Sequence, residues 1–87
     1  MPRFYFHIHD GRDQLDLDGT ELPEEATAHI EAIRLAGAVL RDEAMRVVET
    51  TSWTMNVTDA SGHPVYRVDV RLSPCRAPAL LADIVQE

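Results

Sequence analysis

The pattern of apolar and polar positions predicts strands at both ends of the chain. Residues 3–9 alternate, with Phe4, Phe6 and Ile8 on one face and more polar side chains on the other. A period of two is typical of a half-buried β-strand. Residues 52–59 and 66–72 repeat this alternation on either side of Asp59-Ala60-Ser61-Gly62, which is a typical turn, so they predict a β-hairpin.

The middle of the chain predicts one long helix. After the Asp10-Gly11 turn, Leu15 and Leu17 alternate with acidic residues and predict a short second strand or an extended arm. Pro23-Glu24-Glu25 then favours a helix start, because proline is tolerated in the first turn and acidic side chains suit the positive end of the helix dipole. The helical pattern continues to about Met45.

The predicted helix carries two apolar stripes on opposite sides. One stripe contains Ala26, Ile30, Ile33, Gly37, Leu40 and Ala44. The other contains Ala28, Ala32, Leu35 and Val39. We expect the first stripe to face the sheet, because a mid-helix glycine costs about 1 kcal/mol and suggests close backbone packing. The second stripe is then a predicted partner-binding surface, covered by the chain after Pro74 or by a second copy.

The order of segments predicts a two-layer ββαββ fold of the α+β class. An antiparallel sheet would carry the long helix on one face. Residues 1–73 would form a single domain, and residues 74–87 a C-terminal tail or short helix. The expected inner face of the sheet contains Phe4, Phe6, Ile8, Trp53, Met55, Val57, Tyr66, Val68, Val70 and Leu72.

Composition narrows the range of functions. The chain has 87 residues, enough for one domain, and a net charge of −7 from fifteen acidic and eight basic residues. This acidity argues against a nucleic-acid partner, which needs clustered basic residues. The apolar runs are too short to span a bilayer, so we expect no membrane partner and a cytoplasmic location. Because no Gly-rich phosphate loop is present, we expect no cofactor.

One short stretch is a candidate metal site. His7-Ile8-His9-Asp10 places two imidazoles on one face of the first strand, roughly 7 Å apart at their Cα atoms. A closed site needs three or four ligands, and Asp10, His63 and Asp69 are the candidates for the rest. We favour the simpler interpretation, in which both histidines decorate an outer sheet face.

That outer face is also a candidate ligand surface. It would carry Tyr5, His7, His9, Arg67 and Arg71. Arginines beside a tyrosine suit an acidic peptide or a phosphate. A water-facing sheet surface is the simpler alternative, since antiparallel sheets often expose one face.

The motifs together resemble a known family. The opening M-P-R-F-Y-F-H-I-H-D-G, the segment Asp18-Gly19-Thr20-Glu21-Leu22-Pro23, and Trp53-x-Met55-x-Val57-x-Asp59-x-x-Gly62 resemble a group of short bacterial proteins classed as a domain of unknown function. Its members typically begin M-P-R-aromatic-aromatic-F and carry D-x-x-G-x-x-L-P before the helix. The resemblance covers roughly residues 1–72. It implies the fold and brings no activity.

Three functional hypotheses remain. The sequence favours a non-enzymatic interaction or regulatory module that acts as a homodimer, because the helix is apolar on two sides and no catalytic set converges. The segment order also looks loosely like small bacterial antitoxins, which suggests an inhibitor of a basic partner protein. A metal-binding protein or metal-dependent enzyme using His7 and His9 is the third hypothesis.

Overall fold

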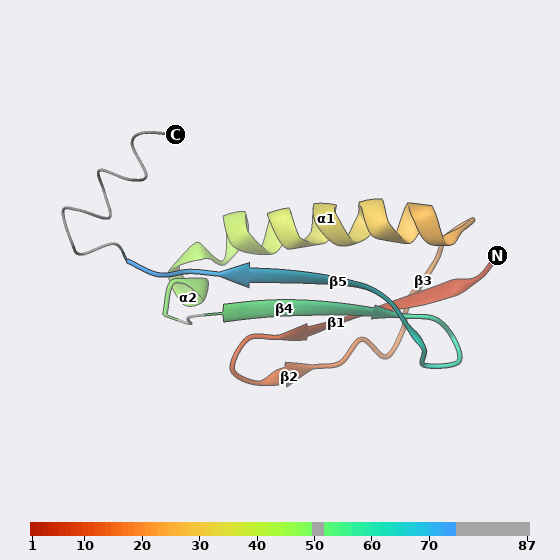
Figure 1. Cartoon of the computed structure of the whole chain (residues 1–87), viewed down its shortest axis with the longest axis horizontal. Coiled ribbons are helices and arrows are strands. Elements are labelled where there is room, and N and C mark those ends of the chain that lie inside the picture. Colours follow the sequence, from red (N-terminus) through yellow and green to blue (C-terminus); the bar gives the residue numbers. More distant parts are fainter. Residues whose placement is uncertain (50–51, 75–87) are drawn as a thin grey trace.

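The computed structural model describes residues 1–49 and 52–74 and confirms the predicted α+β class. A long and a short helix lie on one side of an antiparallel sheet (Figure 1). The predicted C-terminal helix lies outside the described residues. Neither described helix is long and apolar enough to cross a membrane. The elements are β1 (Arg3–His9), β2 (Asp13–Gln14), β3 (Thr20–Glu21), α1 (Glu25–Asp42), α2 (Ala44–Val47), β4 (Ser52–Thr58) and β5 (Pro64–Arg71).

The sheet has one well-protected edge and one long open edge. Its strand order is β2-β1-β4-β5, and β3 pairs with the start of β1. The predicted hairpin is confirmed as β4 and β5, and β4 also pairs with β1, where Phe6 lies opposite Val57. The two-residue strands β2 and β3 follow the outer side of β1. The eight-residue β5 forms the other edge.

Of the two alternatives predicted for Leu15 and Leu17, the short strand is wrong. Both leucines are exposed, and the short strands β2 and β3 lie before and after them. The reason is Asp16, whose Oδ1 accepts the backbone N–H groups of Asp18 and Gly19 at 3.1 and 3.0 Å. Such local bonds to a side chain compete with a strand ladder and turn the backbone away from it.

The predicted inner face of the sheet is confirmed. Phe4, Phe6, Trp53, Met55 and Val57 are buried, and the remaining predicted positions are partly buried against them. Matching residues on the helices complete the core, namely Ala28, Ala32, Ala36 and Val47.

The predicted assignment of the two helix stripes is reversed, except at Leu40 of the first stripe, which packs against the core as expected. Ala28 and Ala32 are fully buried against the chain's own sheet, and Leu35 and Val39 pack against the same core, so these four residues do not form a free partner surface. Ile30 and Ile33, which we expected to face the sheet, are 51 % and 58 % exposed. A Cβ at Gly37 would meet nothing within 4 Å, so the expectation of close packing between Gly37 and the sheet is also wrong.

The reversal follows from the sizes of the facing side chains. The sheet presents bulky residues, including Phe6, Trp53 and Met55, and these already fill most of the space between the layers. Protein interiors are close-packed, so large side chains on one layer need small ones on the other. Alanines meet this requirement, whereas an inward row of isoleucines would overfill the core.

The backbone conformation and close surroundings of Gly19 predict that a side chain there would destabilise the fold. Its φ is +72°, and a Cβ there would lie 2.8 Å from both Arg3 Cγ and Tyr5 Cε2. Gly19→Ala should therefore lower the free energy of unfolding by roughly 2–3 kcal/mol in urea titrations. Gly62→Ala is the matched control, since Gly62 has a φ of +86° but open space at its Cβ position. Equal losses in the two variants would contradict the packing described around Gly19.

Candidate functional site

The outer sheet face collects the residues that the sequence suggested for ligand binding. Cross-strand register places His7 opposite Asn56, which lies opposite Arg67. His9 lies opposite Thr54 in the neighbouring row. The rings of Tyr5 and His7 stack in parallel planes with centroids 6.3 Å apart. The structure thus brings the predicted set onto one face, spread over three strands.

His7 is fully engaged in the fold. Its Nδ1 accepts the backbone N–H of Asp16 at 3.1 Å, so the ring proton lies on Nε2 and is donated to Thr58 Oγ1 at 3.2 Å. A metal ligand needs a free lone pair on a ring nitrogen. In this arrangement His7 has none to offer, which removes one of the two histidines from the candidate metal site.

His9 does not assemble a site either. Its Nδ1 lies 2.6 Å from Asp13 Oδ1, in an exposed pair across the β1–β2 turn. His63 lies in the hairpin at the other end of β4, near Asp59. No group of three His, Cys, Asp or Glu side chains within residues 1–49 and 52–74 has metal-binding geometry.

Two of the charged residues on the β5 part of this face, Arg67 and Asp69, are paired with each other, while Arg71 lies opposite Ser52. Arg67 Nε donates to both oxygens of Asp69 at 2.9 and 3.1 Å, and Thr54 donates to the same carboxylate. The hydrogen bond from Arg67 lowers the pKa of Asp69, burial opposes this shift, and Thr54 adds to it. Because Arg67 is already neutralised, it is a poor receptor for an incoming anion.

Asp10 forms a buried ion pair that joins two parts of the fold. Its side chain is fully buried and forms an ion pair with Arg46 of α2, and Gln14 donates to it at 3.2 Å. The hydrogen bond from Arg46 lowers the pKa of Asp10, burial opposes the shift, and the charges of Arg46 and Arg12 add to it. The pair fastens the β1–β2 turn to α2.

Asp16 is a residue that sequence reasoning missed. Besides its two bonds within the loop, its Oδ2 accepts the backbone N–H of Phe6 at 3.1 Å. Burial raises the pKa of Asp16, but the backbone N–H groups of Gly19, Phe6 and Asp18 and the nearby His7 outweigh burial and lower it. The D-x-x-G segment before the helix is thus a loop held by hydrogen bonds from backbone N–H groups to the Asp16 side chain. The spacing of this Asp and Gly19 in the sequence was the signal for the loop.

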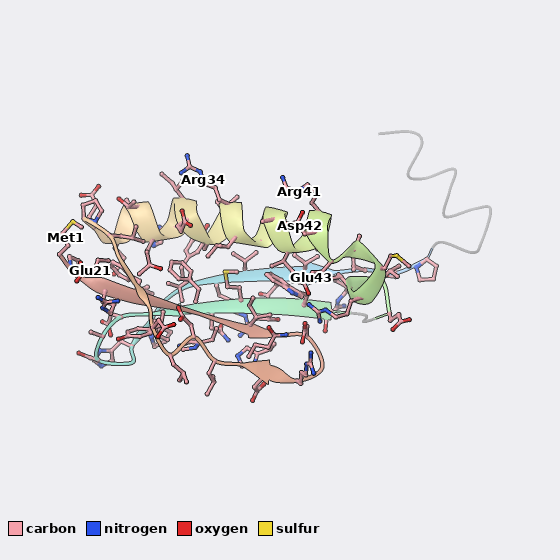
Figure 2. All side chains as sticks on the ribbon, turned by 180° about the vertical axis from the view of Figure 1, so that it is seen from behind. Met1, Glu21, Arg34, Arg41, Asp42 and Glu43 are labelled. Carbon is pink, nitrogen blue, oxygen red and sulfur yellow. The ribbon has the colours of Figure 1, made fainter. Side chains whose placement is uncertain are left out.

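The outer side of α1 presents an apolar surface, which we call the isoleucine flank. It consists of Ala26, Ile30, Ile33 and Gly37, all exposed. Figure 2 shows Arg34 and Arg41 on the same helix, pointing away from the sheet. Arg34 is one helical turn after Ile30 and Arg41 one turn after Gly37, so both share the outward side of α1 with the flank. The prediction that this surface faces the core is wrong, because periodicity alone does not say which of two stripes faces inward.

The isoleucine flank lies on the same side of the molecule as the open sheet edge. His29 of α1 stacks on Tyr66 of β5 with ring centroids 4.2 Å apart. Ala26 and Ile33 are three residues before and four residues after His29, so they share its side of the helix. Figure 1 shows β5 next to α1 among the strands of the sheet. One partner can therefore reach both features.

Comparison with known proteins adds a family and no function. The model of DUF6894, described as a domain of unknown function, matches residues 3–71. No curated protein and no solved structure matches.

The Asp10–Arg46 ion pair predicts how the free energy of unfolding depends on pH. Because the pKa of Asp10 is lower in the folded chain than its ordinary 3.8, the pair stabilises the fold above about pH 5 and loses this effect as the pH falls through the lowered pKa. The difference in unfolding free energy between wild type and Asp10→Asn should be large at pH 7 and shrink in acid. Asp13→Asn, an exposed carboxylate in the same turn, should cost little at pH 7. A difference for Asp10→Asn that stays constant down to pH 3 would contradict this account.

Proposed function

The chain belongs to the DUF6894 family, a domain of unknown function, and we propose that it is a non-enzymatic interaction module that forms a homodimer through the isoleucine flank. The observation that carries this proposal is the exposure of Ile30 and Ile33 in the middle of an ordered helix. The two isoleucines are one helical turn apart and form a contiguous apolar patch, and contiguous exposed apolar patches commonly mark contacts with other proteins.

The composition of the isoleucine flank supports a protein interface. The chain carries fifteen acidic residues among 87, yet none of the four flank positions is acidic. Depletion of charge is typical of the centre of a protein–protein interface, while charges gather at the rim. The charged side chains one helical turn from a flank position are both basic, namely Arg34, which follows Ile30, and Arg41, which follows Gly37.

Gly37 gives independent support. A glycine inside a helix costs about 1 kcal/mol relative to alanine. Within the described residues nothing lies close enough to Gly37 to require the missing side chain. A second helix packed against the flank would require it, because small residues allow two helix backbones to approach closely. The glycine is thus explained by a partner more readily than by the monomer.

A second copy of the chain is the occupant that this surface fits best. A two-fold contact places the same patch on both subunits, so an uncharged apolar flank meets an uncharged apolar flank. The net charge of −7 suits attraction of a basic protein, but the flank itself offers no acidic side chain to such a partner. We therefore place self-association ahead of an antitoxin-like role.

The chemistry of the remaining surface favours a non-enzymatic role. The side chains with catalytic or ligand-binding potential are engaged elsewhere: His7 and Asp16 hold the loop after β2, Asp10 holds α2, and Arg67 pairs with Asp69. General acid–base or nucleophilic catalysis needs such groups to converge on a substrate.

Self-association is tested by mass. Sedimentation equilibrium at micromolar concentrations should give twice the 9.8 kDa of one chain. Ile33→Asp should restore the monomer mass, because a carboxylate in the centre of the interface loses its hydration without a partner. Leu17→Asp makes the same change at a leucine that is 83 % exposed in the loop before β3, and it should leave the dimer intact. A monomeric wild type would remove the proposal.

Gly37→Ala separates folding from association. Nothing blocks the added methyl group in one chain, so the variant should raise the unfolding free energy by about 0.5–1 kcal/mol, measured in the monomeric Ile33→Asp background. In the otherwise wild-type chain the same change should weaken the dimer, because the methyl group separates the two helices. A dimer that tightens instead would show that Gly37 lies outside the interface.

A further inference from the structure

We infer that two copies join edge to edge through antiparallel pairing of β5 with β5, centred on Val68, so that the two sheets become one continuous sheet. This inference rests on the proposed function and specifies how the homodimer is built. It adds a strand contact to the helix contact already proposed.

β5 is a long, open edge of the sheet. β5 is an eight-residue strand whose one described neighbour is β4. An edge strand presents a row of backbone donors and acceptors that can pair with another chain, and natural proteins usually shorten or cover such edges. The opposite side of this sheet follows that rule with two-residue strands, whereas nothing described covers the outer side of β5.

Opposite charges flank Val68 in β5, with Arg67 on one side and Asp69 on the other. In an antiparallel pair centred on Val68, Arg67 of each copy lies directly opposite Asp69 of the other. The two residues are each 62 % exposed at the side chain and share the outer face. Opposite charges that face each other across strands are favourable, and like charges are unfavourable. When the intrachain Arg67–Asp69 pair is exchanged for two pairs between chains, the strand is complementary in charge to a second copy of itself. We therefore assign the edge to this occupant and not to an unrelated peptide.

The apolar side chains of β5 on the inner face of the sheet are incompletely buried. Met55 and Val57 of β4 are fully buried, whereas Tyr66, Val68 and Val70 of β5 are only partly buried. The same pairing places Val68 against Val68 and Tyr66 against Val70 of the second copy. These apolar pairs would extend the core across the junction between the two sheets.

The helix contact and the strand contact are compatible in position. The stacking of His29 on Tyr66 fixes the isoleucine flank above the β5 side of the sheet. A two-fold axis through Val68 brings the two flanks toward each other on one face of the joined sheet. A single symmetric interface then covers both the isoleucine flank and the open edge of β5.

Two charge variants test the register. Arg67→Asp makes the β5 pair wholly acidic and Asp69→Arg makes it wholly basic, so each variant alone should weaken its own dimer by roughly tenfold. An equimolar mixture should form a heterodimer, because each acidic position then faces a basic one. Native mass spectrometry identifies this species by its mass, and far-UV circular dichroism confirms that both variants fold.

The intrachain pair between Arg67 and Asp69 is broken in both variants, so recovery in the mixture reports contact between chains. If the wild type dimerises and Ile33→Asp dissociates it, but the charge variants associate like the wild type, the strand pairing is overturned and the helix-mediated dimer stands. A mixture that associates no better than its components also overturns it. A monomeric wild type rejects both proposals together.

Discussion

The packing of three small residues against a bulky sheet orients the whole molecule. Ala28, Ala32 and Ala36 lie against the core made by the aromatic and methionine side chains of β1 and β4. Because the alanines take the inward side of α1, the isoleucines of the same helix must face outward. The exposed surface is therefore a direct consequence of how the core fills its volume, and the proposed function depends on that choice.

Polar residues that resemble functional groups are used to hold loops in place. Asp16 gathers three backbone N–H groups, and Gly19 fits beside Arg3 only because it has no side chain. Asp10 ties the first turn to α2 through Arg46. In a chain this small, such polar ties supplement a modest core. The same residues are then engaged in contacts that hold the fold together.

The fold was predictable because strand periodicity is local and the chain shows it clearly. The alternation around Phe4, Trp53 and Val68 identified the strands and their inner face. The choice between two helix stripes was not predictable from periodicity, since it depends on the volumes of side chains on another layer. The strand alternative at Leu15 failed for a related reason: the hydrogen bond that the backbone N–H of Phe6 donates to Asp16 joins positions ten residues apart, which a pattern of period two does not reveal.

The central claim is that the outward side of α1, and not its alanine side, meets a second copy. A sample mixed from isotope-labelled and unlabelled chains allows intermolecular nuclear Overhauser effects to be separated from those within one chain. Contacts between chains should appear at the methyl groups of Ile30 and Ile33. Intermolecular contacts at Ala28 and Ala32 in their place, or a dimer whose isoleucine methyl groups show none, would contradict the account.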